Sequence, residues 1–585
     1  HSEETIEMAI KAAEKLAVNE YYPINSVGDQ TGVAYDKGKV RVPEEYKSAY
    51  KKFCEAGWMA PSESYDAGGQ QLPLAVNFIV QMLFFAANQS LMVYSCLTHS
   101  AGKVIEIFGT EEQKRKYLEA LWSGRYQGCM DLTEPQAGSD VGAVRTKAIP
   151  NDNGTYSIVG NKIFISGGDT DLTENTVHIL LARIEGDAEG TKGLSCFIVP
   201  KIRVNNDGTP GKSNDVTCTG VEHKTGMKGS ATCSLAYGDN NQCTGELLGE
   251  RGKGIVTMFH MMNEQRIVVG LEGFSMGSSA YLHALDFARA RKQGVVFGQK
   301  AGDQVPIIKH PDIRKNLLLM KSYTEGIKAL LLYTIHCMDL MNVTQDKAEK
   351  QKYSDLIEVL TPICKAYGAE KSFENCVTAV QVHGGYGYCR DYYVEQLMRD
   401  CKITTIYEGT NGIQANDLLG RKIVMRDGAA FQTLLSEIYS VIESTQGIDG
   451  LSPYADDMED YVHMLADISE QLRGEMSGGN AYLAYSWASQ YLNLFGDIVL
   501  GWMFLAQAQI AYEKRNTIFD ANGAVSKVVQ DNIAGSDLDA IFYTSKINTA
   551  KFFIGSVLPQ VKGKIDAIWK NDDAFLKMED KFFLD

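Results

Sequence analysis

The stretch Arg399–Arg421 reads RDCKITTIYEGTNGIQANDLLGR and places one carboxylate, Glu408, between an aromatic ring and a glycine. Apolar Ile403 and Ile406 lie just upstream. A carboxylate in apolar surroundings has a raised pKa, because burial disfavours its charged form, and such a group can serve as a base. Gly409 lets the backbone approach a bound group closely. The alternative is a loop glutamate ahead of a helix that begins at Thr410, and this stretch alone leaves both interpretations open.

Three further stretches share the chain with it. They are Asp131–Asp140 (DLTEPQAGSD), Ala290–Gln299 (ARKQGVVFGQ) and His383–Tyr388 (HGGYGY), the last preceded by Gln381. In this order, and together with the Glu408 stretch, they resemble the flavin-dependent acyl-CoA dehydrogenase family from about residue 40 to about residue 425. The resemblance implies a mostly α fold, with a helical N-terminal domain, a central antiparallel, β-barrel-like domain and a helical bundle.

Composition sets limits that fit this reading. The chain has 585 residues, of which 44% are hydrophobic and 22% charged, as in a soluble globular protein of several domains. The formal net charge of -16 argues against a nucleic-acid partner and against a basic membrane-docking face. No apolar run reaches the ~18 residues that a spanning helix needs, so we expect no integral membrane segment.

The twelve cysteines form no CxxC pair. The nearest approach to a cluster is Cys218, Cys233 and Cys243, and free thiols in a reducing compartment explain them better than a metal site does. We therefore expect no metal and a cytoplasmic location. The chain begins with His-Ser rather than Met, so a removed targeting peptide stays an alternative.

Residues 1–125 are expected to form a helical domain, because apolar residues recur at helical spacing between short connectors. Thr110 ahead of two glutamates is a candidate helix cap. The expected helices cover 3–20, 43–58, 72–88, 90–108 and 111–122.

Residues 126–250 change to short apolar stretches separated by Gly, Asn and Asp, which predicts antiparallel strands. Ile163–Ser166, Val177–Ile184 and Leu194–Pro200 are the clearest, and Asn205–Asp215 is expected to be a surface loop.

Helical patterns return over 251–425, where Gly270, Gly273 and Gly277 recur on one face and predict a close-packed neighbour. Residues 426–585 predict an additional C-terminal helical domain. Within it, apolar Val499–Ala511 is expected to be a packed helix rather than a membrane-associating one, because it lacks a basic face. The expected helices cover 252–293, 310–343, 346–382, 391–402, 410–425, 431–445, 459–476, 481–514 and 536–554.

The resemblance assigns chemistry to several positions. Glu408 matches the family's base, which removes the Cα proton of an acyl thioester, and its backbone N–H matches part of the oxyanion site. Arg266, Tyr407 and Gly409 are expected at the substrate together with Glu408. In some relatives the base stands at the position aligned with Gln265. Glu264 is one residue off that position, about 100° around a helix, and is expected to be structural.

FAD is the implied cofactor. Leu132 and Thr133 match residues along the isoalloxazine edge, and Ser139 matches a pyrophosphate contact. Phe164 and Ser166 stand where the family has Trp and Thr beside the ring, so an aromatic wall and a hydroxyl are kept.

Other contacts are expected from a neighbouring subunit, which predicts an obligate homodimer. Arg291 matches the arginine that reaches the neighbour's FAD pyrophosphate, although Gly294–Val296 are inserted before Phe297; an exposed cation at a helix end is the alternative. The expected partners of the neighbour's adenosine are Gln381, Gly384 and Gly385. Thr410 and Asn411 match FAD contacts after the base, whereas Gly412 replaces a glutamine and that contact is not expected.

The predicted function is FAD-dependent α,β-dehydrogenation of an acyl-CoA, with electrons passed to an electron-transfer flavoprotein. Alternatives are a 3-methylmercaptopropionyl-CoA dehydrogenase, an acyl-CoA oxidase-like enzyme, and a non-catalytic relative that acts in complex assembly. Aryl, cyclic or decarboxylating substrates also stay open. One sequence does not separate a thioether from a methylene, because the two are nearly isosteric and discrimination amounts to ~1–3 kcal/mol.

Overall fold

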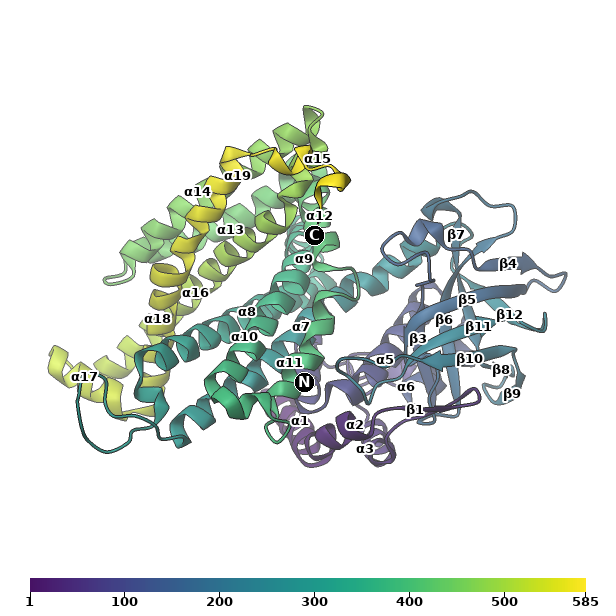
Figure 1. Cartoon of the computed structure of the whole chain (residues 1–585), viewed down its shortest axis with the longest axis horizontal. Helices are drawn as coiled ribbons and strands as arrows, with labels where there is room; N and C mark the ends of the chain where they lie inside the picture. Colours follow the sequence, from purple (N-terminus) through teal and green to yellow (C-terminus); the bar gives the residue numbers. More distant parts are fainter. Residues whose placement is uncertain (585) are drawn as a thin grey trace. The chain divides into compact units, whose positions relative to one another are not determined.

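The computed structural model describes residues 1–584, apart from the side chains of residues 259–261. The chain forms two compact units. Unit 1 comprises His1–Met276 and Arg390–Ile403, and unit 2 comprises Gly277–Cys389 and Thr404–Asp585. Figure 1 shows helices at the N-terminus, then strands, then helices again.

Apart from α2, which was not expected, the helices of unit 1 follow the expected ranges, and unit 1 also contains the N-terminal part of α7 (Gly254–Ala290). Its other helices are α1 (Glu3–Leu16), α2 (Asn25–Thr31), α3 (Glu44–Glu55), α4 (Leu74–Ala87), α5 (Gln89–Phe108), α6 (Glu111–Trp122) and α11 (Val394–Cys401). Thr110 caps α6 in a capping box with Gln113, as predicted. The first helix ends at Leu16, earlier than expected, because the chain widens into a π turn at Ala17–Tyr21 and then forms a 3-10 turn at Tyr22–Ile24, which contains Pro23.

Unit 1 also contains one large sheet in the order β10-β11-β5-β12-β7-β6-β3, with β4 beside β5 and β6. Most neighbours are antiparallel, as predicted, whereas β3 and β4 each run parallel to β6. Its strands are β3 (Tyr126–Asp131), β4 (Lys147–Pro150), β5 (Tyr156–Ser166), β6 (Asn175–Ile184), β7 (Leu194–Pro200), β10 (Val216–Val221), β11 (Thr232–Tyr237) and β12 (Thr244–Leu248). A small hairpin of β1 (Ala34–Asp36) and β2 (Lys39–Arg41) interrupts the region that was expected to be helical throughout.

The expected loop Asn205–Asp215 is partly a strand. β9 (Pro210–Ser213) pairs with β8 (Ile202–Val204) in a small hairpin. All four residues of β9 are exposed, so this strand has no apolar alternation that a sequence pattern could detect.

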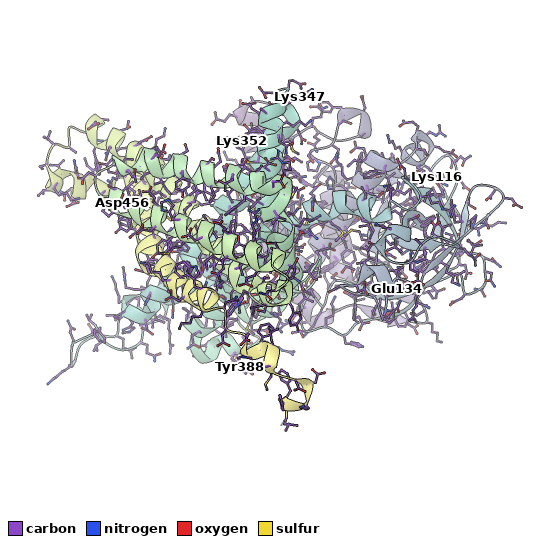
Figure 2. The ribbon with its side chains drawn as sticks, turned by 90° about the horizontal axis from the view of Figure 1, so that it is seen from above. Lys116, Glu134, Lys347, Lys352, Tyr388 and Asp456 are labelled. Carbon is purple, nitrogen blue, oxygen red and sulfur yellow. The ribbon has the colours of Figure 1, made fainter. Side chains whose placement is uncertain are left out.

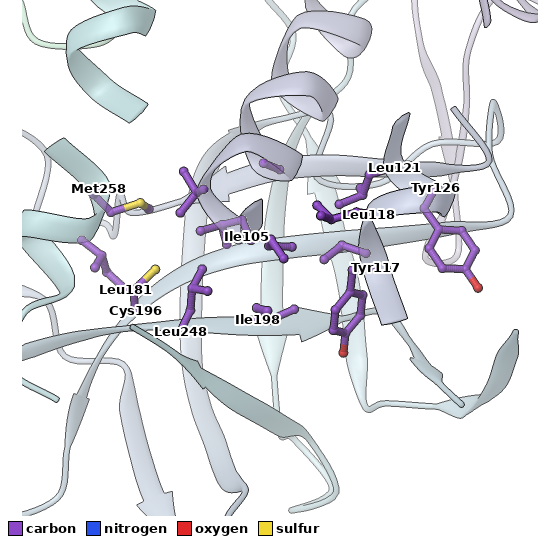
Figure 3. Close-up of a cluster of buried hydrophobic side chains, with 14 of the residues drawn as sticks. Ile105, Tyr117, Leu118, Leu121, Tyr126, Leu181, Cys196, Ile198, Leu248 and Met258 are labelled. Atoms are coloured by element: carbon purple, nitrogen blue, oxygen red, sulfur yellow. The ribbon is translucent and has the colours of Figure 1, made fainter. Parts of the chain in front are cut away.

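The core of unit 1 lies between the sheet and the helices α5 and α6. Figure 3 shows Ile105, Leu118 and Leu121 from the helices beside Leu181 and Ile198 from the strands, and all five are buried. At the edge of this layer, Lys116 Nζ lies 2.5 Å from Glu246 Oε1 and joins α6 to β12.

Unit 2 is helical. It holds the C-terminal part of α7 (Gly254–Ala290), then α8 (Pro311–Val343), α9 (Lys347–Pro362), α10 (Gly368–His383), α12 (Asn411–Gly420), α13 (Ala429–Gln446), α14 (Ser452–Ser477), α15 (Ala481–Ser486), α16 (Ala488–Ala521), α17 (Lys527–Ser536), α18 (Leu538–Phe552) and α19 (Val561–Lys570). The helix expected over 346–382 is interrupted at Pro362 by a π turn, Ile363–Tyr367. A methyl group added at Gly277 on α7 would lie 2.9 Å from Ser372 Cβ on α10, which confirms close packing there.

The C-terminal extension packs into unit 2 through polar and apolar contacts. Tyr367 donates to Asp497 Oδ1 on α16 at 2.6 Å, and Lys564 on α19 pairs with Asp497 Oδ2 at 2.5 Å. Lys352, labelled in Figure 2, joins α9 to Glu437 on α13 at 2.6 Å.

One helix among residues 1–584, Ala488–Ala521, is long and apolar enough to cross a membrane, and 78% of its apolar stretch is buried. Residues Val499–Leu505, Ala508 and Ala511 are all buried, so the expectation of a packed helix is confirmed.

Candidate active site

Glu408 lies in a short loop of unit 2 directly before α12. Its backbone is left-handed, with φ +54°, and Gly409 follows with φ +84°. A non-glycine residue in this region is strained, and such strain persists mainly at functional sites. Thr410 is the N-cap of α12 and accepts from Ile413 N at 3.3 Å. Ile406, the apolar residue just upstream, is 50% exposed.

Residues near Glu408 make contacts that sequence reasoning missed. Gln414 Nε2 donates to the Glu408 carbonyl at 3.4 Å. Asn411 donates to Glu370 Oε2 at 3.0 Å and accepts from Lys365 Nζ at 3.4 Å. Asn411, a predicted FAD contact, is therefore already held by two charged side chains. Neither partner belongs to a motif, so no local pattern pointed to them.

Arg291, Gly384 and Gly385 come together in unit 2 around an open cavity of about 740 Å³. The Arg291 guanidinium lies 5.5 Å from the centre of the Tyr386 ring. No heavy atom lies within 4 Å of a methyl group added at either glycine, so the backbone there is open to a ligand. Gln381 is exposed on α10 and is not among the residues that line the cavity. A cation, an aromatic ring and open glycine backbone fit a phosphate-bearing nucleotide.

The insertion Gly294–Val296 does not remove Arg291 from this cavity. Gln293 N donates to the Val305 carbonyl and Val305 N to the Gly294 carbonyl, both at 3.0 Å, so the inserted residues begin a closed loop. Phe297 is 79% exposed in that loop. His310 Nε2 lies 2.7 Å from the Gln293 carbonyl and anchors the loop at the cavity wall.

In unit 1 the predicted flavin-edge segments lie side by side. Ile163 N donates to the Thr133 carbonyl at 2.9 Å, which joins Leu132–Thr133 to β5. Phe164 has φ +58° where the register between β5 and β11 shifts, and its ring is 59% exposed. Leu132, Thr133 and Ser166 are partly exposed, and Ser139 is exposed. Residues 132–133 and 164–166 thus present an accessible surface that a flat ring could contact.

Glu134 and Lys162 lie behind this surface and were not predicted as site residues. Their side chains are 3% and 0% exposed, and Lys162 Nζ lies 2.9 Å from Glu134 Oε1 (Glu134 is labelled in Figure 2). Burial would raise the pKa of Glu134, but the Lys162 charge and hydrogen bonds from Thr146 and Arg145 N overcome it and bring the pKa to about 2. Burial lowers the pKa of Lys162.

A second buried network surrounds Asp131. Its carboxylate lies 2.8 Å from His178 Nδ1 and accepts from Tyr237 and from Cys129 Sγ, the latter at 3.0 Å. Metal-ligating atoms of Cys129, Asp131 and His178 lie within 4.8 Å of one another. They already hydrogen-bond to each other directly, so the geometry is that of a hydrogen-bond network that fixes the end of β3.

Arg266 and Gln265 are buried on α7 within unit 1, each 4% exposed. Gln265 hydrogen-bonds to Ser100 on α5. Glu264 faces a charged cluster in which Glu63 Oε1 lies 2.9 Å from His99 Nε2 and Glu63 Oε2 lies 2.5 Å from Lys103 Nζ. Burial raises the pKa of Glu264, as does the charge of Glu63. Sequence reasoning did not point to this cluster, because its members lie far apart along the chain.

Comparison with known proteins identifies the family of the chain. Residues 3–125, 129–239 and 252–423 match the N-terminal, middle and C-terminal domains of acyl-CoA dehydrogenase, and residues 434–579 match the family described as acetyl-CoA dehydrogenase C-terminal like. Butyryl-CoA dehydrogenase of Syntrophomonas wolfei is 36% identical over 573 residues, covering 96% of this chain and 91% of the relative.

The 3-methylmercaptopropionyl-CoA dehydrogenase of Ruegeria pomeroyi is 36% identical over 564 residues, covering 95% and 90% of the two chains. The structure of a Bacillus anthracis acyl-CoA dehydrogenase complexed with FAD superposes with a TM-score of 0.72 at 22% identity, covering 99% of this chain and 90% of that one. The fold therefore includes the C-terminal extension, and the chain belongs to the acyl-CoA dehydrogenase family.

Proposed function

We propose that the protein oxidises an acyl-CoA thioester to the trans-2-enoyl-CoA and that Glu408 is its base. The observation that carries this proposal is the left-handed backbone of Glu408, followed by Gly409 at φ +84° and a capped helix. Strain of this kind is retained where a side chain must be aimed. The Glu408 carboxylate accepts the Cα proton, and its backbone N–H donates to the thioester oxygen as negative charge develops there.

The acyl-CoA dehydrogenase family uses FAD, and the residues present here fit it. Leu132, Thr133, Phe164 and Ser166 would lie along the ring. Ser139 would meet the pyrophosphate of the same FAD, with Thr410 and Asn411 as further contacts. Arg291 would meet the pyrophosphate of a neighbouring subunit's FAD, and Gln381, Gly384 and Gly385 its adenosine. FAD, when bound, supplies the acceptor for the hydride that leaves Cβ. Arg266, Tyr407 and Gly409 would hold the acyl thioester against Glu408.

We further infer a homodimer, because Arg291 and Gly385 are expected to serve the FAD of a neighbouring subunit. The proposed electron acceptor is an electron-transfer flavoprotein, and the proposed location is the cytoplasm. An active monomer in scattering or mass measurements would contradict the dimer. Rapid peroxide formation by the reduced enzyme in air would favour an oxidase instead.

The substrate class is tested by anaerobic bleaching of the flavin with butyryl, octanoyl, palmitoyl, 3-methylmercaptopropionyl and phenylpropionyl thioesters. The two named relatives act on short acyl groups by their names, one alkyl and one thioether. Fast bleaching by one thioester establishes dehydrogenation and ranks the substrates. A yellow protein that none of them bleaches would contradict the proposed substrate class.

Glu408→Gln tests the base directly. The variant is expected to keep FAD and to bind acyl-CoA, while bleaching slows by about two to four orders of magnitude because the Cα proton has no acceptor. Glu264→Gln is the control, and its bleaching rate should change little. Near-normal bleaching by Glu408→Gln, or a large loss in Glu264→Gln, would move the role of base to Glu264.

A further inference from the structure

The Glu134–Lys162 ion pair is fully enclosed in the β domain. Lys162 stands on β5 with no exposed side-chain area, and Glu134 belongs to the segment after β3. Burying two charges is costly unless hydrogen bonds satisfy them, and apolar residues of similar size often serve stability as well. A pair of this kind therefore calls for a reason beyond stability.

Lys162 contacts more than its ionic partner. Its ammonium also donates to the Leu132 carbonyl at 2.9 Å, while the next residue, Ile163, donates its N–H to the Thr133 carbonyl at 2.9 Å. Phe164 follows with its left-handed backbone and exposed ring. One buried cation thus sets the backbone of Leu132–Thr133 relative to that of Phe164.

Glu134 brings a third segment to the same point. Its carboxylate accepts from Arg145 N at 2.7 Å, from Thr146 N at 3.0 Å and from Thr146 Oγ1 at 2.5 Å. These residues lead into β4. The Glu134 carboxylate therefore fixes the segment after β3 against the residues that lead into β4. Lys162 in turn holds β5 against that segment.

We propose that Glu134 and Lys162 are positioning residues for FAD, which align Leu132–Thr133 with Phe164–Ser166 so that both can contact one ring. This inference rests on the proposed function, in which FAD lies against those two segments. It assigns the pair an effect on FAD affinity that is separate from its effect on folding.

The variants must avoid leaving one charge buried alone, because that would destabilise the domain whatever its role. The double variant Glu134→Gln with Lys162→Met removes both charges, retains a side-chain oxygen for Thr146 and deletes the donor to Leu132. The matched control is Lys116→Met with Glu246→Gln, which removes the ion pair between α6 and β12 in the same unit.

The experiment measures the FAD dissociation constant by fluorescence, the visible spectrum of the bound flavin and the Tm of each apoprotein. We expect the double variant to bind FAD at least about tenfold more weakly and with a changed spectrum, since it loses a charge-assisted hydrogen bond that orders the site. Its apoprotein Tm should fall no further than that of the control, whose FAD affinity should stay within about threefold of wild type.

Thr146→Val is the milder second variant, which decides the matter if the double variant does not fold. It removes one hydrogen bond to Glu134 and should weaken FAD binding by about threefold to fivefold. FAD binding by the double variant within threefold of wild type, or unchanged binding by Thr146→Val when only that variant folds, would overturn the inference. Either result with a wild type that binds FAD and is bleached leaves the proposed function standing. A wild type that does not bind FAD overturns both.

Discussion

The segments Asp131–Glu134 and Tyr407–Thr410 both carry predicted site residues, yet they are held by different means. The first has a buried acid at each end, Asp131 and Glu134, and each carboxylate accepts hydrogen bonds from several donors. The second holds its carboxylate on a strained, left-handed backbone and is anchored by a helix cap and a glycine. Buried charge makes a segment sensitive to the loss of a partner, whereas backbone strain makes it sensitive to the residue type at one position.

The largest effect on stability is expected from Lys162→Met. This variant leaves the Glu134 carboxylate buried without its cation, which destabilises a protein by about 3–5 kcal/mol. Denaturant unfolding of the apoprotein measures the loss. The double variant with Glu134→Gln should recover much of it. A loss below 1 kcal/mol in the single variant would show that the buried charge does not secure the first segment.

The second effect on stability concerns acid, which should act on the first segment, Asp131–Glu134. The pKa of Glu134 is about 2 in the fold, below its ordinary value of 4.5. A carboxyl with a depressed pKa stabilises the fold above its ordinary pKa, and that stability is lost as pH falls towards the folded pKa. The window is thus pH 4.5 down to 2. Denaturant unfolding across this window measures the free energy of unfolding. The double variant should lose less of it than wild type does, by on the order of 1–2 kcal/mol. Equal losses would contradict the assignment.

The effect expected at the second segment is no larger than that of acid. Gly409→Ala places a methyl group at φ +84°, 2.6 Å from Gln414 Nε2, and should destabilise unit 2 by about 1–2 kcal/mol. Gly412→Ala is the matched control inside α12, where the added methyl group would lie 3.8 Å from Thr410 Oγ1, and it should stabilise by about 0.5–1 kcal/mol. Equal effects of the two substitutions in denaturant unfolding would mean that the loop before α12 is not strained.

The helices were predictable because they carry local signals. The cap at Thr110 and the apolar periodicity of α3 to α6 determine each helix from neighbouring residues. The parallel pairing of β3 with β6 was not predictable, because it joins residues about fifty positions apart with no hairpin between them. Likewise, the break at Pro362 continues as a π turn whose helical character keeps the apolar pattern unbroken.

Sequence reasoning could propose site residues that stand in motifs, but not residues whose role depends on contacts made only in the fold. Glu408, Arg291 and Gly385 stand in recognisable stretches, and the structure brings the last two to one cavity. Lys162 reads as an ordinary polar residue of a strand, and only the fold shows that it is buried against Glu134, 28 residues earlier. The roles of all these residues stay predictions until the variants are measured.

The contact between Tyr367 and α16 has a consequence for shortening the chain. A methyl group at Gly496 would overlap the Tyr367 ring, and the Tyr367 hydroxyl donates to Asp497, the next residue. Gly326 on α8 is likewise in close contact with Leu500, 2.8 Å from an added methyl group. The helical bundle and the C-terminal extension therefore pack closely only because small residues stand at these positions. Removing the last 160 or so residues would leave the bundle without the side chains that fill this interface, so a chain cut after about residue 425 is expected to lose stability.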